Sequence, residues 1–135
     1  MSNALYDAGR NAFAKGDIDW LNDTIKCQLL DADYTPNLST NDFLDDVASA
    51  ARVGTAQTLA GKTASAGVVD ANDVVFTAVT NATNVTMILI YKDTGVEGTS
   101  QLIALYDTAT NLPVTPNGGD ITVQWSSGAN KIFKL

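Results

Sequence analysis

Two short apolar stretches decide the fold: Val85–Tyr91, with the sequence VTMILIY, and Leu102–Tyr106, with the sequence LIALY. Both are too short for a typical helix and rich in residues that favour strands. Successive side chains of a strand point to opposite faces, and here both sets of positions are apolar. Each face must therefore be covered, by a second sheet on one side and by a helix, a loop or a partner subunit on the other.

Further strands are predicted on both sides of these two stretches, separated by turns rich in Gly, Asn and Asp. The predicted strands are Thr24–Leu30, an ambiguous one within residues 48–60, Lys62–Val69, Val74–Val79, Val85–Tyr91, Gln101–Asp107, Asp120–Ser126 and Lys131–Leu135. Connections this short join antiparallel neighbours, because a parallel crossover needs a dozen or more residues. The sequence thus predicts a mainly β protein, an antiparallel β-sandwich or small barrel with a short N-terminal helix.

Two predicted strands show a regular alternation that assigns their faces. Ile121, Val123 and Trp125 alternate with polar residues, which describes a strand with one wet face. In the first strand, Cys27 lies between apolar neighbours of the same face and is predicted to be a small buried hydrophobe.

The length of 135 residues predicts a single domain spanning residues 1–135. Residues 1–16 form the predicted helix or arm, capped by Ser2 or Asn3 and ended by Gly16, and residues 17–135 form the β domain. The helix is indicated by apolar residues at helical spacing: Leu5, Ala8, Ala12 and Phe13. A single helical turn is expected after Thr40 or Asn41, carrying Phe43, Leu44 and Val47.

The composition excludes several classes of function. The net charge is −7, from 15 acidic and 8 basic residues, which disfavours nucleic acid as a partner because phosphate contacts need a basic surface. No apolar stretch is long enough to cross a membrane, and no secretory signal is visible. The chain has no histidine, the side chain best poised for acid–base catalysis at neutral pH, so we expect a non-enzyme with no catalytic residue.

Carboxylates gather at three places: Asp31/Asp33, Asp42/Asp45/Asp46 and Asp70/Asn72/Asp73. None continues into a spaced ligand set such as a calcium-binding loop, so we interpret them as solvated turns and expect no metal and no cofactor. An enzyme acting through a pair of these Asp residues is the alternative.

Nine stretches taken in order resemble a family of small virion structural proteins of tailed bacteriophages. They are ALYDAGR (4–10), AF (12–13), DW (19–20), TIK (24–26), FLDD (43–46), ARV (51–53), IYKDTG (90–95), PVTPNGGDITV (113–123) and GANKIFKL (128–135). The resemblance spans nearly the whole chain, and its specificity lies in the order of the stretches.

The resemblance implies a capsid decoration, or cement, protein that is synthesised in the host cytoplasm and located on the capsid surface of the virion. Its partners would be the major capsid protein and copies of itself, most simply as a homotrimer at a local three-fold axis. Tail, neck or fibre-associated structural roles, and a virion-borne module that binds glycans or a host surface, are the alternatives.

The partner interface is predicted at six apolar or aromatic residues: Leu5, Tyr6, Phe13, Trp20, Phe43 and Leu44. An amphipathic N-terminal helix could dock in a groove of the shell. Alternatively, the helix covers the domain's own sheet, as amphipathic helices usually do.

Overall fold

The two apolar stretches form the centre of a five-stranded antiparallel sheet in a computed structural model that describes residues 4–80, 83–108, 112–129 and 131–135. The strand order is β1-β8-β7-β2-β3. Their bounds are Ala4–Leu5 for β1, Leu102–Tyr106 for β8, Met87–Lys92 for β7, Ile25–Leu30 for β2 and Arg52–Thr58 for β3. Every neighbouring pair is antiparallel, as the short connections predict.

Both faces of this sheet are buried by the chain itself. Ile88 and Ile90 of β7 belong to one core cluster, whereas Leu89 and Tyr91 belong to a second cluster on the opposite face. Successive residues of β7 are all apolar because they point alternately into two cores, one on each side of the sheet. A partner subunit is not needed to cover either face.

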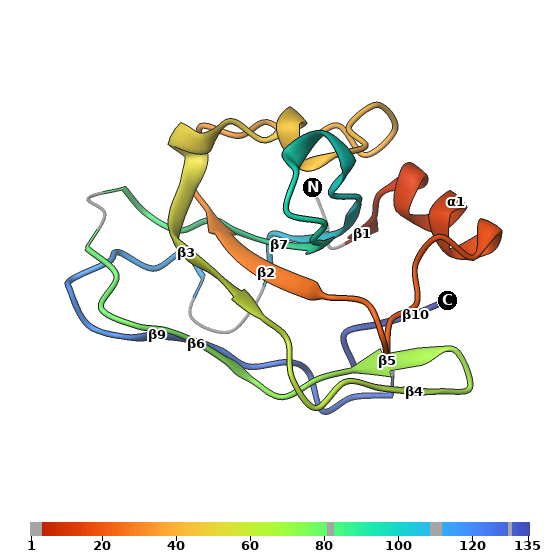
Figure 1. Cartoon of the computed structure of the whole chain (residues 1–135). Coiled ribbons are helices and arrows are strands. Elements are labelled where there is room, and N and C mark those ends of the chain that lie inside the picture. The colour runs from red at the N-terminus through yellow and green to blue at the C-terminus, as the bar shows by residue number, and fades with distance from the viewer. Residues whose placement is uncertain (1–3, 81–82, 109–111, 130) are drawn as a thin grey trace.

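The first core lies between this sheet and a layer of short strands, at the bottom of Figure 1. This second layer consists of a three-stranded sheet, β10-β5-β4, and a two-stranded sheet, β6-β9. The bounds are Thr63–Ser65 for β4, Val68–Asp70 for β5, Val74–Phe76 for β6, Ile121–Val123 for β9 and Phe133–Lys134 for β10. The predicted mainly β, sandwich-like fold is confirmed.

The second core lies between the opposite face of the five-stranded sheet and residues 31–51, which run along the top of Figure 1. This segment supplies Tyr34, Leu44, Val47 and Ala51 to the core, and it contains two single turns of 3-10 helix. The turns are η1, Leu44–Asp46, and η2, Ser49–Ala51, and a third, η3, covers Glu97–Thr99. The helical turn expected after Thr40 or Asn41 corresponds to η1, but the predicted cap is wrong, because Phe43 occupies the N-cap position and Val47 the C-cap position.

Helix α1, Asp7–Lys15, covers the end of the five-stranded sheet beside β8. It begins after Tyr6, which occupies the N-cap position, so Leu5 belongs to β1 and not to the helix, while Ser2 and Asn3 lie outside the described residues. A Cβ atom at Gly9 would lie 2.8 Å from the carbonyl oxygen of Leu102. The helix can approach the strand backbone this closely only because residue 9 has no side chain. The helix ends at Gly16, as predicted.

The predicted strand Lys62–Val69 is wrong as a continuous element. It divides into β4 and β5, which pair as a hairpin across a turn at Ala66 and Gly67. Both turn residues have positive φ, 52° and 80°, which is the backbone geometry of a tight hairpin turn. The run of small residues in this region concealed the turn, because Ala66 is not a typical turn residue.

The ambiguous segment within residues 48–60 is mostly strand, because β3 occupies Arg52–Thr58. The register between β2 and β3 shifts after Cys27, and the side-chain amide of Gln28 donates to the carbonyl oxygens of Val53 and Gly54 there. Gln28 is buried, and these hydrogen bonds satisfy the N–H donors of its side-chain amide. Bulges of this kind twist an edge strand and discourage pairing with other chains.

Candidate functional site

The six predicted interface residues do not form a surface. Leu5, Tyr6, Trp20 and Leu44 are at most 9% exposed and pack in the two cores. The prediction that these four side chains contact a partner is therefore wrong for the folded chain, because their apolar surface is already covered. The two others, Phe13 and Phe43, are partly exposed, and their contact with a partner stays a prediction.

Tyr6 ties the N-terminal segment to the layer formed by residues 31–51. Its hydroxyl group lies 2.8 Å from that of Tyr34, which donates to Oδ1 of Asn41 over 2.8 Å. Burial, followed by the hydrogen bond with Tyr34, raises the pKa of Tyr6 far above its ordinary value of 10.0. This residue is a structural anchor, and it makes the N-terminal segment part of the domain instead of a free arm.

Phe13 and Trp20 meet at the ring of Phe133 near the C-terminal strand. The ring centroids lie 5.9 Å from Phe13 to Phe133 and 5.5 Å from Trp20 to Phe133, both in edge-to-face geometry. The indole Nε1 of Trp20 donates to the carbonyl oxygen of Asp70. The helix, the loop after it and β10 are thus joined by aromatic contacts within the chain.

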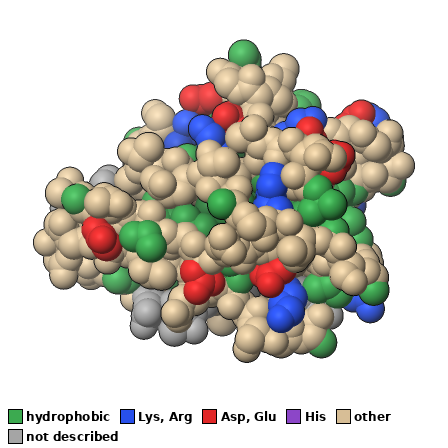
Figure 2. Space-filling view, turned by 60° about the horizontal axis from the view of Figure 1, so that its bottom comes forward, with side chains coloured by type: hydrophobic (Ala, Val, Ile, Leu, Met, Phe, Trp, Pro, Cys, Tyr) green, Lys and Arg blue, Asp and Glu red, His purple; other side chains and the backbone are tan. Residues whose placement is uncertain are grey.

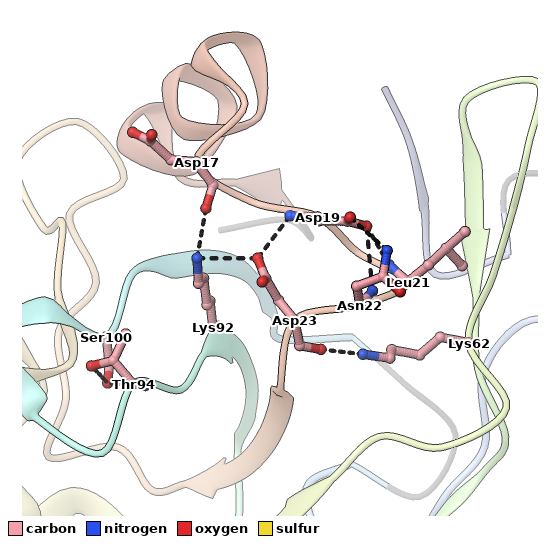
Figure 3. Close-up of polar contacts among 9 residues, drawn as sticks. All are labelled: Asp17, Asp19, Leu21, Asn22, Asp23, Lys62, Lys92, Thr94 and Ser100. Carbon is pink, nitrogen blue, oxygen red and sulfur yellow. Dashed lines mark hydrogen bonds and ion pairs between the residues drawn. The ribbon is translucent and has the colours of Figure 1, made fainter.

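A network of polar contacts fixes the loop between α1 and β2, as Figure 3 shows. The Asp23 carboxylate accepts from the backbone N–H of Asp19 over 2.8 Å and pairs with Nζ of Lys92 over 3.1 Å. Lys92, at the end of β7, also donates to the carbonyl oxygen of Asp17 over 2.7 Å. The ammonium group of Lys62 donates to the carbonyl oxygen of Asp23. Two lysines, Lys92 at the end of β7 and Lys62 just before β4, therefore hold one loop in place.

Asp19 closes the same loop from within. Its carboxylate accepts hydrogen bonds from the backbone N–H groups of Leu21 and Asn22 and from the side-chain amide of Asn22. The amide of Asn22 is the main cause that lowers the pKa of Asp19 below its usual 3.8. The arrangement is a turn stabilised by an aspartate, which explains why Asp is so frequent in this sequence.

A second polar cluster orders the turn between β7 and β8. Ser100 is fully buried, and its Oγ donates to the carbonyl oxygen of Val96 over 2.8 Å and accepts from the backbone N–H of Thr94 over 3.2 Å. Arg52 of β3 reaches the same turn, with a bidentate pair to Glu97 at 2.8 and 3.1 Å. Its guanidinium also donates to the carbonyl oxygen of Val47. Arg52 thus links this turn to the layer of residues 31–51.

Carboxylates of two of the three clusters accept hydrogen bonds from elsewhere in the chain. Asp31 accepts from the backbone N–H of Asp33 and from the hydroxyl of Thr83, both over 2.9 Å. In the cluster around residues 70–73, Asp73 accepts from the backbone N–H of Trp125 over 3.1 Å. These carboxylates accept hydrogen bonds within the chain, but the interpretation as solvated turns is wrong for Asp31, which is 4% exposed, and Asp73 joins distant segments.

The third cluster is the one that could hold a cation. Carboxylate oxygens of Asp42, Asp45 and Asp46 lie within 4.8 Å of one another, and all three residues are exposed. One oxygen of Asp46 already accepts from the backbone N–H of Asp42 over 2.8 Å. Desolvation, the hydrogen bond with Asp46 and the neighbouring negative charges raise the pKa of Asp42 above 3.8. The cluster stores charge repulsion that a cation or protonation would relieve.

A concavity lies at the edge of the sandwich, between the five-stranded sheet and the second layer, and we call it the Trp125 groove. Its volume is about 790 Å³. Its described lining residues are Ala4, Leu5, Ile88, Tyr106, Thr108, Val123, Gln124, Trp125, Ser126, Ser127, Lys131, Ile132, Phe133 and Lys134. A smaller groove of about 460 Å³ continues along β9 and shares Ile88, Val123 and Gln124 with it.

Two partly exposed aromatic rings, Tyr106 and Trp125, stand in the Trp125 groove with centroids 6.1 Å apart and planes inclined at 57°. The sequence did not reveal this pair, because the two residues are 19 positions apart, Tyr106 on β8 and Trp125 just after β9 of another sheet. Alternation along residues 121–125 did indicate that Trp125 shares a face with Ile121 and Val123. That pattern alone does not show which other aromatic residue lies opposite.

The comparisons with known proteins assign the chain to no family. No protein-family model matches the chain, and no curated protein matches it in sequence. Within the described ranges, no helix has both the length and the apolar character required to span a bilayer.

Proposed function

We propose that this protein is a structural component of a tailed-bacteriophage virion, most specifically a capsid decoration protein that binds the outer shell and stabilises contacts between major capsid subunits. The observation that carries the proposal is the ordered series of stretches, from ALYDAGR at 4–10 to GANKIFKL at 128–135, that resembles small virion structural proteins. The proposal includes no catalytic role and no cofactor.

The fold is compatible with a protein that acts by presenting a surface. The sheet is covered on both faces. Its edge strands are β1, which is only two residues long and has α1 nearby against β8, and β3, which carries the register shift. Arg52 fixes the layer of residues 31–51, and Lys62 and Lys92 fix the loop between α1 and β2. Such a domain offers few soft segments to proteases and needs little ordering on binding, which favours stable attachment.

The burial of Leu5, Tyr6, Trp20 and Leu44 moves the proposed contact surface elsewhere. Large apolar side chains that are at least 46% exposed remain at four positions of the described chain: Leu21, Val75, Val96 and Leu135. Figure 2 shows that the side of the second layer carries few charged groups, with both signs scattered among uncharged atoms. A homotrimer stays a prediction, and the apolar sheet no longer supplies a reason for it.

The copy number of the chain in purified virions tests this proposal. Quantitative mass spectrometry should find hundreds of copies per particle, in a fixed ratio to the major capsid protein. A handful of copies would place the protein in the neck, tail or fibres, and would overturn the decoration role while keeping the virion class. Its absence from particles would overturn both.

A further inference from the structure

We propose that the Trp125 groove binds an acidic saccharide, a sugar that carries a carboxylate group. The inference goes beyond the decoration role and does not depend on it, because it concerns a site on the isolated chain. It rests on three properties of the groove: two fixed aromatic faces, two cations without acidic partners, and short polar side chains along the rim.

The aromatic rings are held in position before any ligand arrives. The indole Nε1 of Trp125 donates to the carbonyl oxygen of Asn72 over 3.0 Å. The hydroxyl of Tyr106 donates to the carbonyl oxygen of Ile132 over 2.6 Å. The polar atom of each ring is therefore satisfied by the protein, while the ring itself stays partly exposed in the groove. A sugar ring has an apolar face of C–H groups that can pack on such a surface, and a fixed ring loses little conformational entropy on binding.

The cations of the groove differ from the others in the chain. Five of the eight basic residues form ion pairs with Asp or Glu: Arg10, Lys15, Lys26, Arg52 and Lys92. Lys62 donates to the carbonyl oxygen of Asp23. Among the described residues, only Lys131 and Lys134 lack such a contact, and both line the Trp125 groove.

This placement is informative in a chain of net charge −7. Acidic partners are plentiful, yet no Asp or Glu is among the described residues that line the groove. Lys131 and Lys134 form no ion pair among the described residues, so both are available to pair with an anionic group of a ligand bound in the groove. The charge therefore selects a ligand that carries a carboxylate over a neutral sugar.

The rim supplies the hydrogen-bonding groups that a sugar needs. Gln124, Ser126 and Ser127 are exposed and line the groove beside Trp125. Amide and hydroxyl groups donate and accept at the same site, as the hydroxyl groups of a saccharide do. The volume of about 790 Å³ lies within the range of small-molecule sites and is sufficient for several sugar units.

An acidic peptide would satisfy the lysines but not the remaining features. Two fixed aromatic rings with short polar groups along the rim suit a chain of sugar rings better than a flexible polypeptide, which would lose more entropy on ordering. We therefore argue for the saccharide, and the experiment includes the peptide as a contradicting outcome.

The test uses the full chain labelled with ¹⁵N and two carboxylated probes, hexagalacturonate and sialyllactose. At least one should shift the indole N–H signal of Trp125 and bind at least about tenfold more tightly than its methyl ester, a difference of about 1.4 kcal/mol. The double variant Lys131→Gln/Lys134→Gln should lose at least about tenfold in affinity while keeping the melting temperature. Lys15→Gln, an exposed cation outside the groove, is the matched control and should bind normally.

Three results would overturn the proposal. The first is that neither probe shifts the Trp125 signal. The second is that the lysine double variant, shown to be folded, binds as tightly as the original chain. The third is that hexaglutamate binds as tightly as the carboxylated sugars, which would mean that the groove recognises charge and not a saccharide. Trp125→Phe supplies a further check, because it keeps an apolar ring but loses stacking area and should weaken binding without unfolding the domain.

Discussion

The five-stranded sheet and the second layer are both antiparallel, but they serve different purposes in the molecule. The central strand β7 has Ile88, Leu89 and Ile90 at most 2% exposed, and it is sandwiched between two cores. In the second layer, β6 alternates buried Val74 and Phe76 with Val75, which is 46% exposed. One region is covered on both faces, and the other has a single core face and an outer face that meets solvent.

The difference shows where stability and recognition are separated. Burial of apolar area supplies most of the folding free energy, so the five-stranded sheet carries the stability of the domain. The second layer closes the first core with short strands and leaves the Trp125 groove at its margin. Changes in the outer face of the second layer are therefore expected to alter binding without unfolding the protein.

The largest expected effect comes from removing a fully buried side chain of the second core. Leu89→Ala should destabilise the protein by about 2–5 kcal/mol, because it removes buried apolar area and leaves a cavity. Val75→Ala, the matched truncation on the outer face of the second layer, should change stability by less than about 0.5 kcal/mol. Urea denaturation of both variants measures the difference. Equal losses would show that the two layers do not differ in the way described.

A smaller effect is expected where α1 meets β8. Gly9→Ala should destabilise the domain by about 1–3 kcal/mol, because the new Cβ would lie 2.8 Å from the carbonyl oxygen of Leu102. Asn11→Ala is the control, since residue 11 is exposed on the same helix and alanine there should stabilise slightly. Thermal unfolding of the two variants would contradict the packing if Gly9→Ala were neutral or stabilising.

The Arg52–Glu97 pair should make stability depend on pH. Hydrogen bonds from Arg52 hold the pKa of Glu97 below its usual 4.5. Because the folded-state pKa is the lower one, the pair stabilises the folded chain above about pH 4.5, and this contribution is lost as the pH falls through the folded-state pKa. Glu97→Gln should be less stable than the original chain at pH 7 and equal to it at low pH. A difference that persists after protonation would contradict the electrostatic origin.

The smallest effect on stability is expected at the cluster of Asp42, Asp45 and Asp46, where the substitution should stabilise the protein instead of destabilising it. Asp45→Asn should stabilise the protein at pH 7 by about 0.2–0.5 kcal/mol, because it removes one of three adjacent like charges. The raised pKa of Asp42 means that the repulsion is present above the folded-state pKa and fades as the pH falls towards 3.8. Denaturation midpoints at pH 7 and pH 3 would show it. Destabilisation at pH 7 would mean that the carboxylate of Asp45 has a partner worth more than the repulsion.

Several elements could be predicted from local pattern alone. The stretch 85–91 revealed a strand with two apolar faces, and the structure places a core on each side of it. Gly16 indicated the end of the helix, and the alternation around Cys27 indicated its burial, which raises the pKa of its thiol. These features are set by short-range periodicity, which the sequence records directly.

The misassigned residues depended on contacts between distant segments. Tyr6 was predicted to contact a partner from the N-terminal helix or arm. Its hydroxyl instead lies against that of Tyr34, 28 positions away. Trp20 is buried because Phe133 and Asp70 close around it. A helical spacing shows that a face is apolar, and it does not show whether that face meets the same chain or another one. The pairing of Tyr106 with Trp125 escaped prediction for the same reason.

The central claim is that this chain acts by binding a capsid with a surface that is rigid before it binds, and stress resistance of virions tests it most directly. Particles lacking the protein should release their DNA at a lower temperature than complete particles, and purified protein added back should restore the original temperature. Leu89→Ala, which removes buried apolar packing, should restore it less well than the original protein. Equal resistance with and without the protein would contradict the account.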